Sequence, residues 1–417
     1  MPYTYINRMP PKIEDKLAKE PTKFFGLSKN VIVMGVVSFL NDLSSDMVFP
    51  FIPIFLTSTL GASASFVGLI EGFADATSGI LKIVSGRVSD IFKIRKPFVV
   101  FGYSLSAISK PILAFAEAPW HVFIVRFFDR VGKGTRDGPR DTLISLSTDK
   151  GQIGKSFGFH RSADTLGAAL GPLLAVAVLP LINNNLRILF LLSFVASFFA
   201  VIILALFVKE VVGTPQPKEE KPEKFKLSLL GSPFIIFLIA TTIFSLGKTS
   251  EAFLILRASN IGVALVLIPI LYFAFNMSLS LFAGPVGVFS DKIGHRNAFM
   301  IGMVLSSITY FLFGINKDIV SIWWLFILFG LATAFIEAVG RAIVSDLVEE
   351  KYRSTAYGLY NALNGFALLP ASVIFGIIWD KSGPLEAFYY SSLMSLIALI
   401  VFGGLRLNHH RKTRFAE

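Results

Sequence analysis

Ionisable side chains that can bind a charged ligand or carry a proton stand inside long apolar stretches of this sequence. A charge at the centre of a lipid bilayer costs roughly 2.5–3.5 kcal/mol even on the gentlest scale, so such residues are expected to line an aqueous cavity and not to face lipid. They concentrate in the first half of the chain. The candidates for substrate binding or proton coupling are Asp42, Asp46, Glu71, Asp75, Arg126, Asp129, Arg130, Arg161, Asp164, Glu251, Glu337 and Arg341.

The first acidic pair is the leading candidate for carrying a proton. Asp42 and Asp46 are four residues apart, and residues at this spacing share one face of a helix. Two carboxyl groups on one face interact, so their titration belongs to the pair. We expect Asp46 first, Asp42 second and Asp164 third to carry the proton.

A structural role is the alternative for each of these charges. Acids and bases on neighbouring helices can simply neutralise each other, and we favour this interpretation for charges near a predicted helix end, such as Arg136, Arg140 and Asp141. Asp129 and Asp164 each have an arginine within four residues. We expect these two acids to exchange ion-pair partners when they are protonated.

The apolar stretches that must position these side chains occupy nearly the whole chain. Of its 417 residues, 53% are hydrophobic and 16% are charged, whereas soluble domains average about 25% charged residues. Since a spanning helix needs about 20 mostly apolar residues, we predict an all-α integral membrane protein with twelve transmembrane helices. They are expected at 31–58, 64–88, 97–115, 119–145, 154–180, 187–208, 229–256, 261–288, 297–316, 321–345, 355–379 and 385–406.

Basic residues collect in alternate connections between these spans, and the positive-inside rule then places both termini in the cytoplasm and the chain in the inner (cytoplasmic) membrane. The formal net charge of +11 resides in these connections, so no nucleic-acid partner is expected. A charged, proline-containing segment divides the spans six and six. The predicted parts are an N-terminal tail (1–30), an N-terminal bundle (31–208), a cytoplasmic linker (209–228), a C-terminal bundle (229–406) and a C-terminal tail (407–417).

Composition excludes several kinds of chemistry. The chain has no Cys, which excludes disulfides, thiolate metal sites and cysteine nucleophiles. It has no G-x-x-x-x-G-K-[ST] motif, so ATP is not expected to be its energy source. No dense cluster of His, Asp and Glu predicts a metal site. We therefore expect neither an enzyme nor a cofactor, and we expect the proton gradient to supply the energy.

A short motif occurs twice, at a spacing of about 200 residues, which matches the division into two halves. Glycine lets two helices approach closely in a membrane, and an Asp at a helix end can pair with a cation that the motion of the halves releases. A gating role is expected for Gly86, Asp90, Arg95, Gly287, Asp291 and Arg296.

With this doubled motif the chain resembles the major facilitator superfamily over nearly its whole length. The family signature between spans two and three reads G-x-x-x-D-R-x-G-R-R/K; the second copy keeps it well, and the first departs from it at Ile91, Lys93 and Ile94. The resemblance implies two six-helix halves related by a pseudo-two-fold axis, with the substrate site between them.

Two further motifs suggest a branch of this family. The fourth span looks like the pattern R-x-x-Q-G-x-G-x-G that is linked to proton coupling, with Asp129 and Arg130 in place of the amide and a glycine. The fifth span resembles the G-x8-G-x3-G-P-x2-G-G motif of drug–proton antiporters, although Ala175 and Val176 replace the last glycine pair. The matching residues of this helix-bend motif are Gly158, Gly167, Gly171 and Pro172.

The resemblance implies a secondary active transporter that moves a small molecule or ion by alternating access, as a monomer in the lipid bilayer. A proton-coupled efflux antiporter is our leading hypothesis. The alternatives are a proton-coupled uptake symporter, a metal, siderophore or organic-anion transporter, and a non-transporting membrane receptor. The acidic face of the first two spans suits a cation and the basic stripe of the fourth suits an anion, so the residues do not select the substrate.

Overall fold

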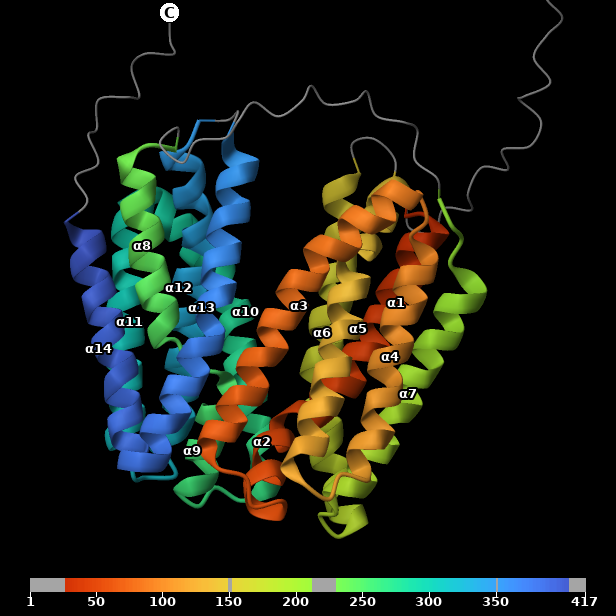
Figure 1. The fold of residues 1–417 in the computed structure, drawn as a ribbon, viewed down its shortest axis with the longest axis horizontal. Helices are drawn as coiled ribbons and strands as arrows, with labels where there is room; N and C mark the ends of the chain where they lie inside the picture. Colours follow the sequence, from red (N-terminus) through yellow and green to blue (C-terminus); the bar gives the residue numbers. More distant parts are fainter. Residues whose placement is uncertain (1–26, 149–151, 212–229, 350–351, 405–417) are drawn as a thin grey trace, which may run out of the picture.

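In the computed structural model, residues 27–148, 152–211, 230–349 and 352–404 are described, and they are almost entirely helical (Figure 1). The predicted tails and linker lie mostly outside these residues. The N-terminal bundle consists of α1 (Lys29–Val48), α2 (Ile52–Ile54), α3 (Ala64–Phe92), α4 (Lys96–Ala114), α5 (Pro119–Leu146), α6 (Ile153–Val178) and α7 (Leu186–Phe207). The C-terminal bundle consists of α8 (Ser232–Gly247), α9 (Glu251–Asn260), α10 (Ile268–Ile293), α11 (His295–Ile315), α12 (Ser321–Leu347), α13 (Arg353–Ser382) and α14 (Pro384–Gly403).

The predicted fold class is confirmed, with two bundles of six membrane segments each (Figure 1). By length and composition alone, ten of the described helical segments are apolar enough to cross a membrane. The two other long helices are α3 and α5, whose apolar stretches are interrupted by acids and bases. These two helices carry most of the candidate site residues.

Two segments are less regular than predicted. The first continues beyond α1 through short turns and α2 to Thr59, because Pro50 and Pro53 cannot donate to the helical ladder. The seventh is two helices: α8 ends at Gly247, and α9 starts afresh where the Ser250 side chain accepts a hydrogen bond from the Ala252 N–H. The break leaves the acidic residue Glu251 in the first turn of α9.

The two bundles touch mainly where α3 runs beside α13, at the lower side of Figure 1. The helices approach so closely that a Cβ added at Gly68 would lie 2.1 Å from the Ser372 carbonyl oxygen. At the same end, the Asp380 carboxylate accepts hydrogen bonds from the backbone N–H groups of Ala64 (2.8 Å) and Ser65 (2.7 Å). This carboxylate at the start of α3 ties the C-terminal bundle to the N-terminal one.

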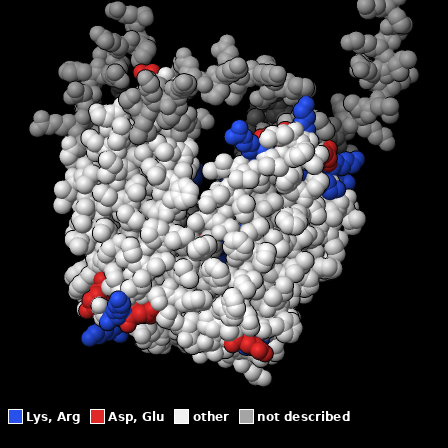
Figure 2. Space-filling view, in the orientation of Figure 1, with Lys and Arg blue, Asp and Glu red and all other residues white. Residues whose placement is uncertain are grey.

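The buried apolar side chains show the same difference between the two sides of the interface. One cluster of buried residues includes side chains from both bundles, such as Val67 and Ile70 of α3 and Phe253 of α9. Two further clusters belong to a single bundle each. In the upper half of the space-filling view the surface is hollowed between the bundles (Figure 2). The interface is therefore closed at the side where α3 begins and open at the side where α7 ends.

Candidate functional site

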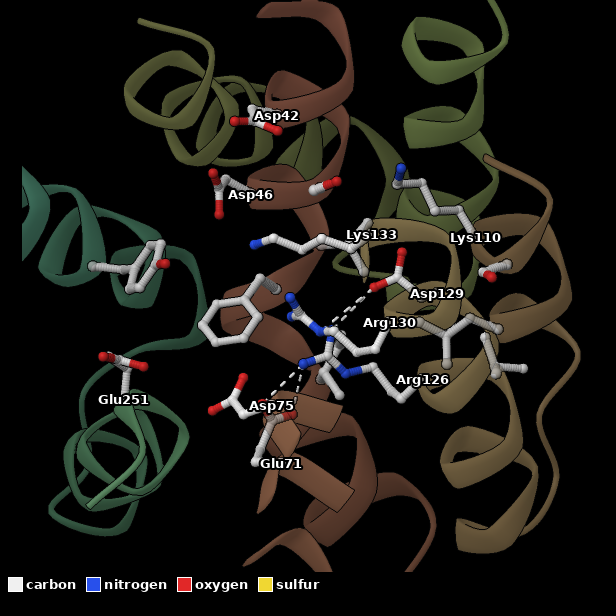
Figure 3. Close-up of a pocket in the computed structure, with 18 of the residues that line it drawn as sticks. Asp42, Asp46, Glu71, Asp75, Lys110, Arg126, Asp129, Arg130, Lys133 and Glu251 are labelled. Atoms are coloured by element: carbon white, nitrogen blue, oxygen red, sulfur yellow. Dashed lines mark hydrogen bonds and ion pairs between the residues drawn. The ribbon is translucent and has the colours of Figure 1, made fainter. Parts of the chain in front are cut away.

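A cavity of about 290 Å³ lies between the bundles and is lined by side chains from α1, α3, α4, α5, α9 and α10 (Figure 3). Its wall is strongly charged, and it also includes the aromatic rings of Phe49 and Tyr272. The charged residues that line it are Asp42, Asp46, Glu71, Asp75, Lys110, Arg126, Asp129, Arg130, Lys133, Arg136 and Glu251.

One buried ion pair joins α3 to α5 in this wall. The Nη2 atom of Arg126 donates to both carboxylate oxygens of Glu71, at 2.9 and 2.8 Å. The two side chains are only 6% and 4% exposed, and the guanidinium lies 5.5 Å from the centroid of the Phe49 ring. The pair neutralises both charges, so its first role is to hold the two helices together.

Asp129 lies between two arginines of its own helix. Its carboxylate is 3.6 Å from Nη1 of Arg126 and 3.8 Å from Nε of Arg130. These distances are ion-pair distances without a strong hydrogen bond. Asp129 therefore lies near both arginines that flank it in the sequence, and the exchange of partners stays a prediction.

The carboxyl groups of α1 differ in their contacts. Asp42 accepts a hydrogen bond from the Asn41 side-chain amide at 3.0 Å, and it also lies in hydrogen-bond range of the Asp164 carboxyl group on α6. Asp164 further accepts the Ser38 hydroxyl and is 3.3 Å from Nη1 of Arg161. Asp46 has no hydrogen bond or ion pair to any described side chain, and it faces the cavity (Figure 3).

Four of the candidate residues do not line this cavity. Asp164 contacts Ser38 of α1 and the 80% exposed Arg161, and neither the acid nor the arginine lines the cavity. Glu337 and Arg341 are exposed on α12. From the C-terminal bundle, Glu251 is the one charged lining residue among those described. The roles expected for these four residues stay predictions.

The two copies of the gating motif make different contacts, although their sequences match. In the first, Arg95 pairs with Asp90 at 3.2 Å. In the second, Arg296 donates to the Gly403 carbonyl at 2.7 Å, and Asp291 contacts His295 at 3.1 Å.

The Cβ positions of the two motif glycines face open space: a Cβ added at Gly86 or at Gly287 would have no atom within 4 Å. The backbone of Gly86 is nevertheless close to α5, since a Cβ added at Gly138 would lie 3.1 Å from the Gly86 Cα. Two helices of the N-terminal bundle therefore approach each other closely beside Gly86. The gating role itself stays a prediction.

The helix-bend motif packs closely against another helix at two of its three glycines. An added Cβ would lie 2.3 Å from the Phe39 carbonyl oxygen at Gly167, and 2.6 Å from the Leu43 carbonyl oxygen at Gly171. The backbones of α6 and α1 therefore touch at both positions. Gly158 has no such neighbour, and α6 continues through Pro172 to Val178.

The sequence-based list missed Lys110, and it assigned Arg136 to structure alone. Lys110 is 6% exposed, lines the cavity, and its Nζ has no hydrogen-bond partner in the described part of the chain. The available signal was that Lys110 is the only charge inside the predicted span 97–115. Arg136 lines the cavity too, while its Nη1 donates to the Ser106 hydroxyl at 2.7 Å.

The described residues contain no group of three or more His, Asp or Glu side chains arranged to hold a metal ion. The cavity instead presents separate carboxylates and separate cationic groups. Such a wall can bind a small charged molecule or carry protons.

Comparisons with known proteins agree with this architecture. The sequence profile of the Major Facilitator Superfamily matches residues 34–282 and 238–417. An uncharacterised MFS-type transporter of Methanocaldococcus jannaschii is 36% identical over 393 residues, covering 92% of this chain and 97% of the relative. Multidrug resistance protein MdtH of Photorhabdus laumondii is 29% identical over 157 residues, covering 38% of this chain and 37% of the relative.

Among solved structures, the nucleoside transporter NupG superposes with a TM-score of 0.76. The match covers 90% of this chain and 98% of that chain at 16% identity. An identity this low shows the fold alone.

Proposed function

Because the chain belongs to the major facilitator superfamily of membrane transporters, we propose that it moves a small charged molecule across the membrane by alternating access, driven by the proton gradient. The observation that carries this proposal is the charged cavity between two bundles that are closed at one side and open at the other. A transporter of this fold exposes such a site to each side of the membrane in turn.

The open side is the cytoplasmic side in our proposal. More basic residues stand at the ends of helices on the open side than on the closed side. On the open side they include Arg87, Lys93, Arg95, Lys96, Lys209, Lys292 and Arg296, and on the closed side Arg187, Arg257, Lys317 and Lys381. Both termini are then cytoplasmic, the membrane is the inner one, and the structure is an inward-facing conformation of a monomer.

Proton coupling is supported by the carboxyl groups on α1. Asp42 and Asp164 are close enough to hydrogen bond to one another, and a contact between two carboxyl groups is favourable when one of them carries a proton. Asp46 faces the cavity without an ion-pair partner among the described residues. We assign proton uptake from the cavity to Asp46, with Asp42 and Asp164 as the neighbouring acceptors.

Export in exchange for protons is the direction we propose. It is supported by the packing of the antiporter-type glycines Gly167 and Gly171 against α1 and by the partial similarity to MdtH, a protein named for multidrug resistance. Uptake by proton symport is the second candidate. Lys110 and Lys133 favour it, because these two cations suit the anionic group of a nutrient.

The test is proton flux in liposomes that contain the purified protein and a pH-sensitive dye. Organic cations, organic anions and zwitterions are added one at a time across an imposed pH gradient. With each compound added outside, we expect one class to evoke proton movement, into the lumen for symport and out of the lumen for exchange. Proton movement no greater than in protein-free liposomes, for every compound, contradicts the proposed coupling.

A further inference from the structure

Some charges in the cavity are paired within the protein, and others have no partner in its described part. Glu71 and Arg126 neutralise each other, and Asp129 lies between two arginines. Lys110 is different: its side chain is more than nine-tenths buried, it lines the cavity, and its Nζ has no hydrogen-bond partner there. A buried ammonium group is unfavourable unless it is paired and hydrogen-bonded. The carboxylates of Asp129, Asp42 and Asp46 attract Lys110 only from beyond ion-pair distance, so an anionic group of a ligand would supply the missing contact.

The unpaired cations form one wall of the cavity. Lys133 lines the same wall as Lys110, and no described carboxylate lies within ion-pair distance of it. In Figure 3 both lysines come from the side of α4 and α5, and the amine of Lys133 points toward Asp46 on α1. An anionic group of a ligand would find its counter-charges on this wall.

Unpaired acids form the opposite wall. Asp75 on α3 and Glu251 on α9 both line the cavity (Figure 3). Neither has a described Lys or Arg within ion-pair distance, and Lys248 attracts both from further away. They come from different bundles. A cation placed between them relieves the repulsion of two like charges and joins the two bundles through the ligand.

We propose that the substrate is a small zwitterion, whose anionic group binds at Lys110 and Lys133 and whose cationic group binds between Asp75 and Glu251. The proposal rests on the proposed transport function and names its substrate class. A simple cation leaves the lysine wall unneutralised, and a simple anion leaves the two carboxylates facing each other. The cavity of about 290 Å³ suits a molecule of the size of an amino acid or a dipeptide.

Because Asp75 and Glu251 belong to different bundles, the two ends of the ligand have different tasks. The anionic group is held by the N-terminal bundle alone, whereas the cationic group draws α9 toward α3. A ligand that lacks the cationic group therefore binds without favouring closure of the open side. This distinguishes the proposed site from a general cavity for charged compounds.

The first experiment measures binding to the purified full chain by calorimetry and by thermal stabilisation. The probes are alanine, phenylalanine, alanylphenylalanine and 2-aminoethylphosphonate. Each is compared with a derivative whose anionic group is neutral, an amide or ester, and with its N-acetyl derivative, whose cationic group is neutral. We expect at least one zwitterion to bind about tenfold or more tighter than both of its derivatives, a difference of about 1.4 kcal/mol. Equal binding of a singly charged derivative, or no binding of any zwitterion, overturns the proposal.

The second experiment tests which charged group of the ligand each side chain binds. Lys110→Met is expected to abolish the preference for the zwitterion over its amide and to keep the preference over the N-acetyl derivative. Glu251→Gln is expected to do the reverse. Lys110→Arg should restore the first preference, and Lys317→Met, in an exposed loop, should alter neither. If Lys110→Met weakens all three compounds by the same factor, the lysine is structural and the assignment is wrong.

The dye-loaded liposomes separate failure of this inference from failure of the transport function. Proton movement evoked by singly charged compounds, without binding of zwitterions, overturns the zwitterion and leaves transport intact. A zwitterion that binds with the expected charge preference but never crosses the membrane contradicts transport and leaves the site intact.

Discussion

The guanidinium of Arg126 donates two hydrogen bonds to the carboxylate of Glu71, across the contact between α5 and α3. Both side chains are almost completely buried beside an otherwise water-accessible cavity. The pair thus stabilises the wall on which the less strongly paired charges of the site stand. The stability that this ion pair contributes therefore limits which substitutions of the other cavity residues the protein tolerates.

Removing one partner of this pair should destabilise the protein strongly. Arg126→Met leaves the buried Glu71 carboxylate uncompensated, which costs about 3–5 kcal/mol, and Glu71→Gln leaves Arg126 with only the more distant Asp129. We expect a large fall in the melting temperature of the purified protein for each single variant. The double variant should recover much of that loss, because two neutral side chains leave no unpaired charge. A double variant that is less stable than both single variants would show that the ion pair itself is favourable.

The contact between α6 and α1 should be intolerant of any side chain at Gly167. A Cβ there would lie 2.3 Å from the Phe39 carbonyl oxygen, so Gly167→Ala must push the two helices apart, at a cost of about 1–3 kcal/mol. Gly158→Ala is the matched control on the same helix, since its Cβ would have no atom within 4 Å. Thermal unfolding of both variants checks this, and equal melting temperatures would contradict the packing.

Closure at the lower side should weaken when Asp380 loses its charge. Its carboxylate accepts two backbone N–H groups at the start of α3, and a hydrogen bond to a charged group contributes about 1.5–3 kcal/mol. Asp380→Asn is therefore expected to increase the population open at that side about tenfold or more.

Because the chain has no Cys, a single cysteine at the cavity residue Tyr272 reports this opening without background. The rate of its reaction with an impermeant maleimide, added from the lower side, should rise in the Asp380→Asn background. Asp318→Asn serves as the control, since Asp318 accepts only local bonds in an exposed loop on the same side. An unchanged labelling rate would exclude Asp380 as a determinant of closure.

Proton-driven transport should depend on Asp46. The Asp46→Asn side chain cannot carry a proton, so accumulation driven by a pH gradient is expected to vanish while exchange of substrate between the two sides continues. Both are measured in the same liposomes, with thermal unfolding as the check that the variant is folded. Undiminished gradient-driven accumulation would remove Asp46 from the coupling role and move attention to Asp42 and Asp164.

Much of the architecture follows from the chain's own chemistry. A bilayer demands about 20 apolar residues for each crossing, so the positions of most helices could be predicted closely. The break between α8 and α9 was harder to foresee, because it depends on the local capping by Ser250. The start of α10 at Ile268, where residue 261 was expected, reflects the extended turn that follows α9.

The candidate site was only partly predictable, for a related reason. The spacing of Asp42 and Asp46 places both on one face of α1, and this face lines the cavity. Nothing in the spacing could tell that Glu251 would line it while Glu337 and Arg341 would not, because that depends on how each helix of the C-terminal bundle is rotated. The sequence analysis overlooked Lys110 because no second charge lies three or four residues away from it in the same predicted span.

The sequence by itself therefore determined that this chain crosses a membrane many times and which charges lie at membrane depth, since burial in lipid constrains each segment separately. Only the tertiary structure decided which of these charges neutralise each other and which remain free to meet a ligand. Pairing such as that of Arg126 with Glu71 joins residues 55 positions apart, and it depends on the relative rotation and depth of packed helices, which no single segment encodes.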